Sequence, residues 1–252
     1  MHRPPKRACT HHVSSDGSCD EAVATTVRLL LNPGVRCMAV CGAGISVAAG
    51  IPDFRSFSGI YKSNKYTIVL PKRWRSSDLF NLNKYLANPS VLLTFLKSLN
   101  MPDCNPTKVH DMFGALMARG ILVRCYSQNI DGLELRSCPE QSVVFLHGRL
   151  PSSPLDWNNL DQYIVFNKQP SFQSPFLYSD MLTSDILLIL GTSLTARSAC
   201  DIVSDFQGHR ILITTDDKQK LPPRRCLYAR GTDTILLQDV QMFATHVLRQ
   251  LD

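Results

Sequence analysis

The sequence predicts an α/β fold built on a doubly wound parallel sheet. Three observations predict it: short, continuous apolar runs, helical patterns between them, and polar or glycine-containing turns directly after several runs. Continuous apolar runs are typical of strands that helices cover on both faces of a sheet. Ligands of such sheets bind beyond the carboxyl ends of the strands, so a binding site is expected at the turns.

The helices follow from start and stop signals. Ser18 and Glu21 form a capping box, and apolar residues at helical spacing continue to the Asn32-Pro33-Gly34 stop. Proline suits the first helical position, so Pro89 and Pro106 each predict a helix. The three expected helices span about 18–31, 89–99 and 106–119. Five strands are expected at about 36–41, 121–126, 186–190, 211–215 and 235–237.

Length and composition limit the protein classes. The 252 residues, 44% of them hydrophobic, suffice for one large domain or for one domain with a small insert. The longest apolar run, 186–190, is far shorter than the roughly 20 residues that span a bilayer. Residues 1–17 are expected to be a disordered basic tail, with neither a secretory signal nor a mitochondrial presequence. Pro4-Pro5-Lys6-Arg7 is either a nuclear import signal or part of that tail.

Cysteine use and charge indicate compartment and partners. The nine cysteines are scattered, and Cys37, Cys41 and Cys125 fall in expected strands, where cysteine serves as a small buried hydrophobe. This indicates a reducing compartment, the cytosol or the nucleus. The chain has no C-x-x-C pair, so we expect no metal site, with a structural zinc site as the alternative. The net charge of +6 is either solvated surface or a means of attracting an acidic partner such as chromatin or a nucleotide.

The turn after the first expected strand is the most informative segment. It reads Gly42-Ala43-Gly44-Ile45-Ser46 and is soon followed by Gly50-Ile51-Pro52-Asp53-Phe54-Arg55-Ser56. In Rossmann-like sheets a strand followed by a glycine turn receives a dinucleotide's pyrophosphate, because glycine allows a close approach and the next N–H groups donate. Glycine turns are common in α/β proteins, but the second segment has no structural reason to follow a plain glycine turn.

Three more signatures lie at expected strand ends or in loops. They are Tyr126-Ser127-Gln128-Asn129-Ile130-Asp131-Gly132-Leu133, Leu146-His147-Gly148 and Gly191-Thr192-Ser193-Leu194. With the glycine turn, and in this order, they resemble the sirtuin family, the NAD-dependent protein deacylases. The resemblance covers roughly residues 20–148 and 164–215. Val47-Ala48-Ala49 and Ser77-Asp78-Leu79-Phe80 are similar to the fungal nuclear branch that acts on histones.

The resemblance implies an enzyme, with NAD as its cofactor. A sirtuin-type catalytic domain over 18–252 would act as an NAD-dependent protein-lysine deacetylase that transfers the acyl group to ADP-ribose and releases nicotinamide. The implied partner is an acetylated protein or peptide, a histone for the fungal branch, with chromatin association. Neither membrane binding nor sequence-specific nucleic-acid binding is implied, and the expected location is the nucleus or the cytoplasm.

The first signature is implied to bind phosphate. The Gly42-Ala43-Gly44 turn would cradle the pyrophosphate, and Ser46 would add a hydroxyl, a role compatible with a serine at a helix start. Asp53-Phe54 falls on the family's mobile loop. Arg55 would contact the phosphates, because a guanidinium matches phosphate geometry, or it forms an ordinary surface salt bridge. Gly191-Thr192-Ser193 would add contacts to phosphate or ribose.

The second signature is implied to hold the riboses and nicotinamide. Gln128 and Asn129 carry amides that hold ribose hydroxyls without adding charge, and Asn129 is also implied in catalysis. Ile130 and Asp131 would line the nicotinamide pocket. The alternative for Asn-Ile-Asp-Gly is a tight turn, because Asn, Asp and Gly favour turns.

His147 is the implied general base. A neutral imidazole, with a reference pKa near ~6.5, accepts a proton at physiological pH. In the family's mechanism the acyl oxygen attacks the nicotinamide ribose, nicotinamide leaves, and the histidine then helps to deprotonate a ribose hydroxyl. The alternative for His147 is a structural histidine. His110, on the helix after Pro106, is expected to pack within the fold, outside the site.

The chain departs from the family between His147 and Gly191. Sirtuins generally carry a zinc module of two cysteine pairs there, whereas only 43 residues separate these two positions and no cysteine lies between Cys138 and Cys200. We therefore expect a reduced small domain lacking the zinc ribbon, with remnants at about 57–87 and 149–165. A structural zinc contributes folding energy, so its absence needs compensation or leaves the region loose.

Further departures concern substrate contacts. The segment Val165-Phe166-Asn167-Lys168 is similar to the one that pairs with the acylated peptide, but a glutamate is usual where Lys168 stands. Thr214 replaces an asparagine, and Thr195-Ala196-Arg197 is not the usual pattern. The missing zinc cysteines and Lys168 leave an alternative function, a catalytically impaired NAD or ADP-ribose binding module. A Rossmann dehydrogenase is a third alternative, but its fingerprint needs Gly or Ala where Val47 stands.

Overall fold

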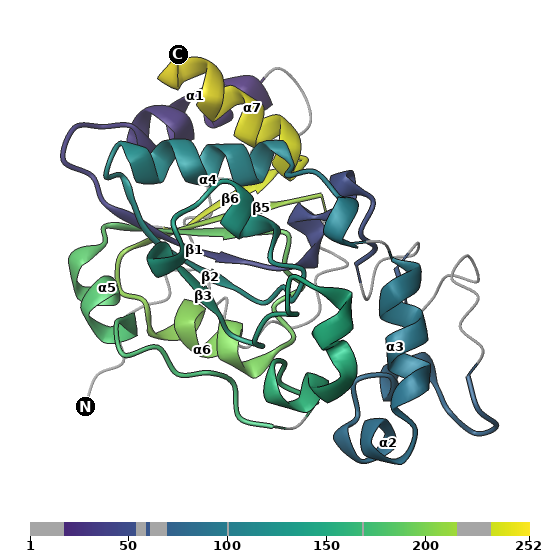
Figure 1. Ribbon diagram of the computed structural model, residues 1–252. Helices are drawn as coiled ribbons and strands as arrows, with labels where there is room; N and C mark the ends of the chain where they lie inside the picture. The colour runs from purple at the N-terminus through teal and green to yellow at the C-terminus, as the bar shows by residue number, and fades with distance from the viewer. Residues whose placement is uncertain (1–17, 54–58, 61–69, 100, 168, 216–232) are drawn as a thin grey trace.

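The computed structural model describes residues 18–53, 59–60, 70–99, 101–167, 169–215 and 233–252. Within these ranges, six parallel strands form one sheet in the order β3-β2-β1-β4-β5-β6 (Figure 1). The strands are β1 (Cys37–Cys41), β2 (Leu122–Ser127), β3 (Val143–Phe145), β4 (Ile186–Leu190), β5 (His209–Thr214) and β6 (Thr234–Leu237). The doubly wound parallel sheet is confirmed. The expected tail at 1–17, together with Phe54, Arg55 and Lys168, lies outside the described residues.

The two central strands are the most apolar. Every residue of β1 and β4 is buried, because both strands have a neighbour on each side and helices on both faces. The five expected strands correspond to β1, β2, β4, β5 and β6 within two residues at each end. Strand β3 was not expected, because three residues are too few to show a periodic pattern.

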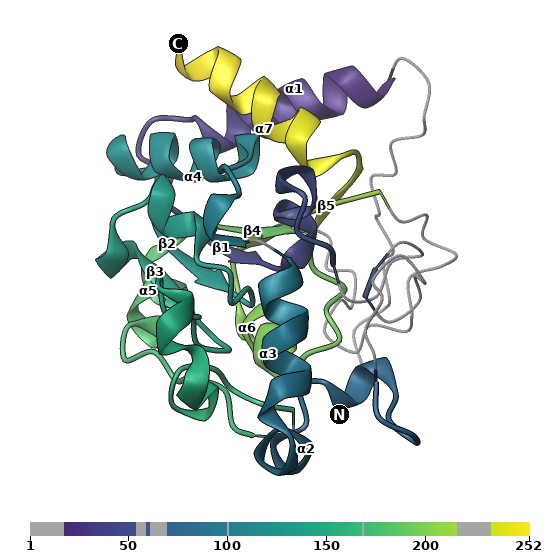
Figure 2. The ribbon, with the colours of Figure 1, turned by 45° about the vertical axis from the view of Figure 1, so that its right-hand side comes forward.

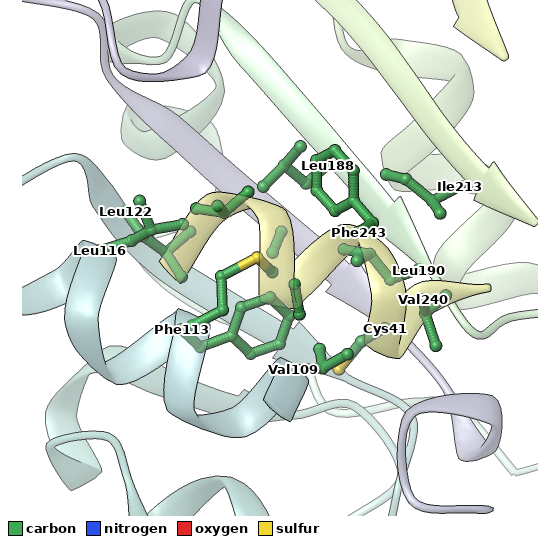
Figure 3. Close-up of a cluster of buried hydrophobic side chains, with 14 of the residues drawn as sticks. Cys41, Val109, Phe113, Leu116, Leu122, Leu188, Leu190, Ile213, Val240 and Phe243 are labelled. Carbon is green, nitrogen blue, oxygen red and sulfur yellow. The ribbon is translucent and has the colours of Figure 1, made fainter. Parts of the chain in front are cut away.

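Helices cover both faces of the sheet. Helices α1 (Ser18–Leu30), α4 (Lys108–Ala118) and α7 (Val240–Leu251) lie on one face, and α5 (Leu177–Thr183) and α6 (Arg197–Asp205) lie on the other (Figure 1). Figure 3 shows Phe113 of α4 and Phe243 of α7 in the cluster on the first face, where both are fully buried. Burial of a phenylalanine contributes about 1.5–3 kcal/mol. None of the helices in the described ranges is both long and apolar enough to cross a membrane.

The start of α4 differs from the expectation. The helix begins at Lys108 with Thr107 as its N-cap, two residues after Pro106. Thr107 and His110 satisfy each other's backbone and side-chain groups at this end, so a cap rather than the proline sets the boundary.

A smaller helical module stands beside the sheet. It contains α2 (Leu82–Ala87), α3 (Pro89–Ser98) and a run of 3₁₀ turns, η7 (Pro154–Gln162), and Figure 2 shows α2 at the lower end of α3. Trp157, Leu160 and Phe166 are buried in its apolar cluster. The Tyr85 hydroxyl accepts from the Leu160 N–H at 3.0 Å, and the Trp157 indole donates to the Pro151 carbonyl at 2.9 Å. Apolar packing therefore joins the described parts of the two segments that we expected to be small-domain remnants.

Candidate functional site

The carboxyl ends of three neighbouring strands bring three of the signatures together. Cys41, at the end of β1, pairs with Ser127 of β2 on one side and with Leu190 of β4 on the other. The loops that follow these residues begin with Gly42, Gln128 and Gly191. The strand order reverses between β1 and β4, and this reversal is where doubly wound sheets bind ligands.

The first and fourth signatures meet backbone to backbone. The Gly44 N–H donates to the Gly191 carbonyl at 2.8 Å, and Gly42 N–H donates to Leu190 O at 3.2 Å. A Cβ on Gly44 would lie 2.7 Å from Gly191 Cα, closer than real Cβ contacts. Gly191 itself has a φ of +60°, which favours glycine. The glycines are therefore required by the contact between the two loops.

Gln128 joins the second signature to the same two loops. Its N–H donates to Cys41 O at 3.0 Å, and its side-chain Oε1 accepts from the Thr192 hydroxyl at 2.6 Å. Ser193, the next residue, lies 2.9 Å from the Thr195 hydroxyl oxygen through its own Oγ. The Gln128 amide is thus fixed at the loop junction, half-buried.

Asn129 points beneath the loops into a buried polar cluster. Its Nδ2 donates to Glu134 Oε1 at 3.1 Å and to Ser46 Oγ at 3.4 Å. The Ser127 hydroxyl donates to the same Glu134 oxygen at 2.6 Å. Ser46 is fully buried, so its hydroxyl binds the second signature in this structure.

Glu134 was missed by the sequence reasoning. It is fully buried, and burial together with the nearby Asp131 raises its pKa well above the ordinary range of a glutamate. The available signal was a carboxylate flanked by two leucines, Leu133 and Leu135. Glu134 is the acceptor that orients Asn129.

Two replacements of Glu134 test its role as the hydrogen-bond acceptor of Asn129 and Ser127. Glu134→Gln keeps an acceptor for Asn129 and Ser127, so we expect the free energy of unfolding at pH 7 to change by less than about 1 kcal/mol. Glu134→Ala removes the shared acceptor of Asn129 and Ser127 and opens a cavity, so we expect a loss of about 3 kcal/mol. Urea unfolding of both variants measures the difference, and equal stabilities would contradict the assigned acceptor role.

His147 follows β3 by two residues and contacts the loop junction through Gln128. Its Nδ1 is 3.1 Å from the Gln128 backbone oxygen, which can only accept, so Nδ1 carries the ring proton. Nε2 is then the basic nitrogen, and the Ser198 Oγ lies 3.3 Å from it. The ring is half-buried, and burial lowers its pKa while the bond to Gln128 opposes that shift. The imidazole is therefore neutral at physiological pH.

A backbone bridge at Gly148 holds the chain next to His147 in place. Gly148 has a φ of +72° and forms an antiparallel bridge with Ile164. The Val165 N–H donates to the His147 carbonyl at 2.8 Å, and the Asn167 N–H donates to Phe80 O at 2.8 Å. The described part of the segment expected to pair with a peptide therefore pairs with the backbone of His147 and with that of Phe80 in the helical module.

An apolar pocket lies between the second signature and the helical module. Asp131 is on its polar side, where its Oδ1 accepts from the Leu133 N–H at 2.9 Å and burial raises its pKa. Asp53 follows the pocket-lining residue Pro52 in the chain, and its backbone carbonyl accepts from the N–H of Ile60, another lining residue, at 2.7 Å. The lining residues are Ala43, Ile51, Pro52, Ile60, Phe80, Phe95, Leu96, Leu99, Met101, Asn129, Ile130 and Asp131.

His110 packs inside the fold, as expected. It is fully buried in α4, where its Nδ1 accepts from the Thr107 N–H at 3.0 Å. The Thr107 hydroxyl in turn donates to Ile45 O at 2.9 Å, so the helix cap supports the first signature from below. Burial lowers the pKa of His110 to about 4.

This pKa predicts a loss of stability in acid. The unfolded chain takes up the His110 proton near pH ~6.5 and the folded chain near pH 4, so stability falls as the pH is lowered through this window. The expected loss is about 3 kcal/mol, and His110→Gln should remove it. Urea unfolding at pH 7 and pH 4 tests this, with His246→Gln on α7 as the matched control. A His110→Gln variant with the wild-type pH slope would refute the assignment.

Comparisons with known proteins agree with this geometry. A model of the Sir2 family matches residues 42–154. The NAD-dependent histone deacetylase HST4 of Saccharomyces cerevisiae is 35% identical over 155 residues, which cover 56% of this chain and 38% of that protein. The NAD-dependent protein deacetylase sirtuin-3 of Mus musculus is 30% identical over 237 residues, covering 81% of this chain and 68% of that protein. The chain thus spans well under half of the yeast relative.

A solved structure supports the same fold. A Sir2 structure with a deacetylated p53 peptide and 3′-O-acetyl ADP ribose superimposes with a TM-score of 0.70 at 22% identity, covering 90% of this chain and 98% of that one. At this identity the match concerns the fold. The family follows from the mouse relative, which is 30% identical and of which the chain covers 68%. The chain belongs to the Sir2 family, the sirtuins.

Proposed function

We propose that this chain binds NAD and acts as an NAD-dependent protein-lysine deacetylase. The observation that carries the proposal is the position of His147, whose Nδ1 lies 3.1 Å from the carbonyl oxygen of Gln128 at the loop junction formed by three signatures, which leaves Nε2 as the basic nitrogen. Homologues named as NAD-dependent deacetylases support it.

The residues fit the parts of NAD. The loops that begin at Gly42 and Gly191 follow β1 and β4, between which the strand order reverses, and this is where doubly wound sheets bind a dinucleotide's pyrophosphate. We assign a ribose hydroxyl to the half-buried amide of Gln128 at the loop junction, because Glu134 and Ser46 hold the amide of Asn129 in the buried cluster. The apolar pocket, with Asn129 and Asp131 on its polar side, suits a flat ring that carries an amide. We assign nicotinamide to this pocket and the phosphates to the glycine loops.

The chain's part in the reaction is orientation and proton transfer. NAD, when bound, supplies the ribose carbon and hydroxyl that receive the acyl group. His147 would take the hydroxyl proton at Nε2, while Gln128 O holds the Nδ1 proton and so fixes the tautomer. The lowered pKa of His147 keeps the base unprotonated at neutral pH.

For the protein substrate we propose an acetylated histone, and for the location the nucleus. The name of the yeast relative supports both, and the net charge of +6 is compatible with association with chromatin.

The test is a product balance. The protein is incubated with NAD and an acetylated histone peptide, and the same peptide without the acetyl group is the control. We expect one nicotinamide and one O-acetyl-ADP-ribose for each lysine deacetylated, measured by mass spectrometry. NAD binding by calorimetry with no product from any acylated peptide would reject the deacetylase and favour the binding module.

A further inference from the structure

The hydroxyl of Ser198 lies against the basic nitrogen of His147. We propose that Ser198 acts together with His147 as the general base, by passing the proton of the ribose hydroxyl to His147. This inference deepens the proposed deacetylase function and rests on it. None of the four signatures contains Ser198, and it follows the segment Thr195-Ala196-Arg197, where the chain departs from the family's pattern.

The direction of the hydrogen bond follows from the ring's other contact. The Gln128 carbonyl takes the Nδ1 proton at 3.1 Å, so Nε2 presents a lone pair. Ser198 Oγ, 3.3 Å from Nε2, must then donate its proton to that lone pair. The distance is at the long end for such a bond, as is common for catalytic groups without substrate. A hydroxyl therefore already occupies the position from which the imidazole would accept a proton.

The position of Ser198 is fixed by the fold. It is the second residue of α6, which packs on the sheet through the buried residues Ala199, Ile202 and Val203. The thiol of Cys200 also donates to Leu194 O at 2.9 Å and holds the start of the helix to the fourth signature. Because α6 is anchored in this way, rotation about one side-chain bond is the main freedom left to Ser198.

The proton transfer balances without any further group. Ser198 Oγ would accept the proton of a ribose hydroxyl of bound NAD as it passes its own proton to His147 Nε2. Ser198 would thereby keep its hydroxyl, and His147 would hold the transferred proton as an imidazolium. With a direct base, by contrast, Ser198 would have to rotate away, and its removal would leave the rate unchanged or raise it.

The experiment compares two reactions of the full chain. Exchange of labelled nicotinamide into NAD reports the step before the base acts, and formation of O-acetyl-ADP-ribose reports the step that needs it. We expect Ser198→Ala to slow ester formation by roughly 10–100-fold, part of the 10²–10⁴-fold of a general base, and to leave exchange within about twofold. Ser198→Thr, which keeps the hydroxyl, should recover most of the rate. Ser204→Ala, on the same helix, is the matched control.

Other outcomes overturn the proposal. Ester formation at the wild-type rate in Ser198→Ala would show a direct base, and an equal loss in both reactions would show a structural role. If the wild-type protein turns over no acylated peptide, the proposed function fails, and ¹⁵N NMR of His147 still decides the contact. We expect a proton on Nδ1 and an Nε2 resonance that shifts in Ser198→Ala. A proton on Nε2, or an unmoved resonance, would refute the relay.

Discussion

Replacement of His147 by glutamine is expected to lower the rate of deacetylation by about 10²–10⁴-fold, the contribution of a general base. Glutamine fits the half-buried position and can still donate to the Gln128 carbonyl, but its amide does not accept a proton at neutral pH. We therefore expect the melting temperature to stay within a few degrees of wild type and NAD binding to persist. Product formation, thermal unfolding and calorimetry measure the three quantities.

The pH dependence of the wild-type rate provides a second measurement on His147. Burial lowers the pKa of the imidazole, so the base stays unprotonated to a lower pH than a free histidine. The acid limb of kcat/KM should accordingly fall below pH ~6.5. An acid limb well above this value, or a His147→Gln variant with substantial activity, would show that another group takes the proton.

Replacement of Gly148 by alanine is expected to have the largest effect on stability, a loss of about 4 kcal/mol. A Cβ there would lie 2.0 Å from Tyr163 O and 2.9 Å from Ile164 Cα, and both are backbone atoms that cannot turn aside. The positive φ adds a cost of about 1–2 kcal/mol. The chain must therefore open the bridge to Ile164, which also loosens the backbone of His147.

Gly120 provides the matched control. Its φ of +70° is close to the +72° of Gly148, but a Cβ on it meets nothing within 4 Å. Gly120→Ala therefore carries the conformational cost alone, about 1–2 kcal/mol, and should leave deacetylation unchanged. Urea unfolding gives the two losses. Similar values for the two variants would mean that the contact behind His147 is soft.

Much of the fold was predictable because its signals are local. The continuous apolar runs at Cys37–Cys41 and Ile186–Leu190 became the two central strands, and Pro89 opens its helix as expected. Two features were missed, one because the strand is very short and one because a neighbouring residue caps the helix. Strand β3 is too short to show a period, and Thr107 rather than Pro106 caps α4.

The site was only partly predictable, for a different reason. Turn residues such as Gly44 and Gln128 stand in recognisable order, so their meeting at one sheet edge follows from the strand pattern. Glu134 and Ser198 acquire their roles only from side chains distant in the sequence or hidden in the core. Nothing in the local sequence of a serine at a helix start indicates that a histidine 51 residues earlier lies beside it.

The backbone contact between Gly44 and Gly191 has an evolutionary consequence. This contact joins loops from the two halves of the sheet and leaves no space for a Cβ on either glycine. The two glycine positions should therefore change slowly in sequence. The helical module is held mainly by packing of apolar side chains such as Leu92 and Phe95. Phe95 also lines the apolar pocket described above. The lining of the pocket can therefore change through repacking of the helical module while the contact between the two glycine loops stays as it is.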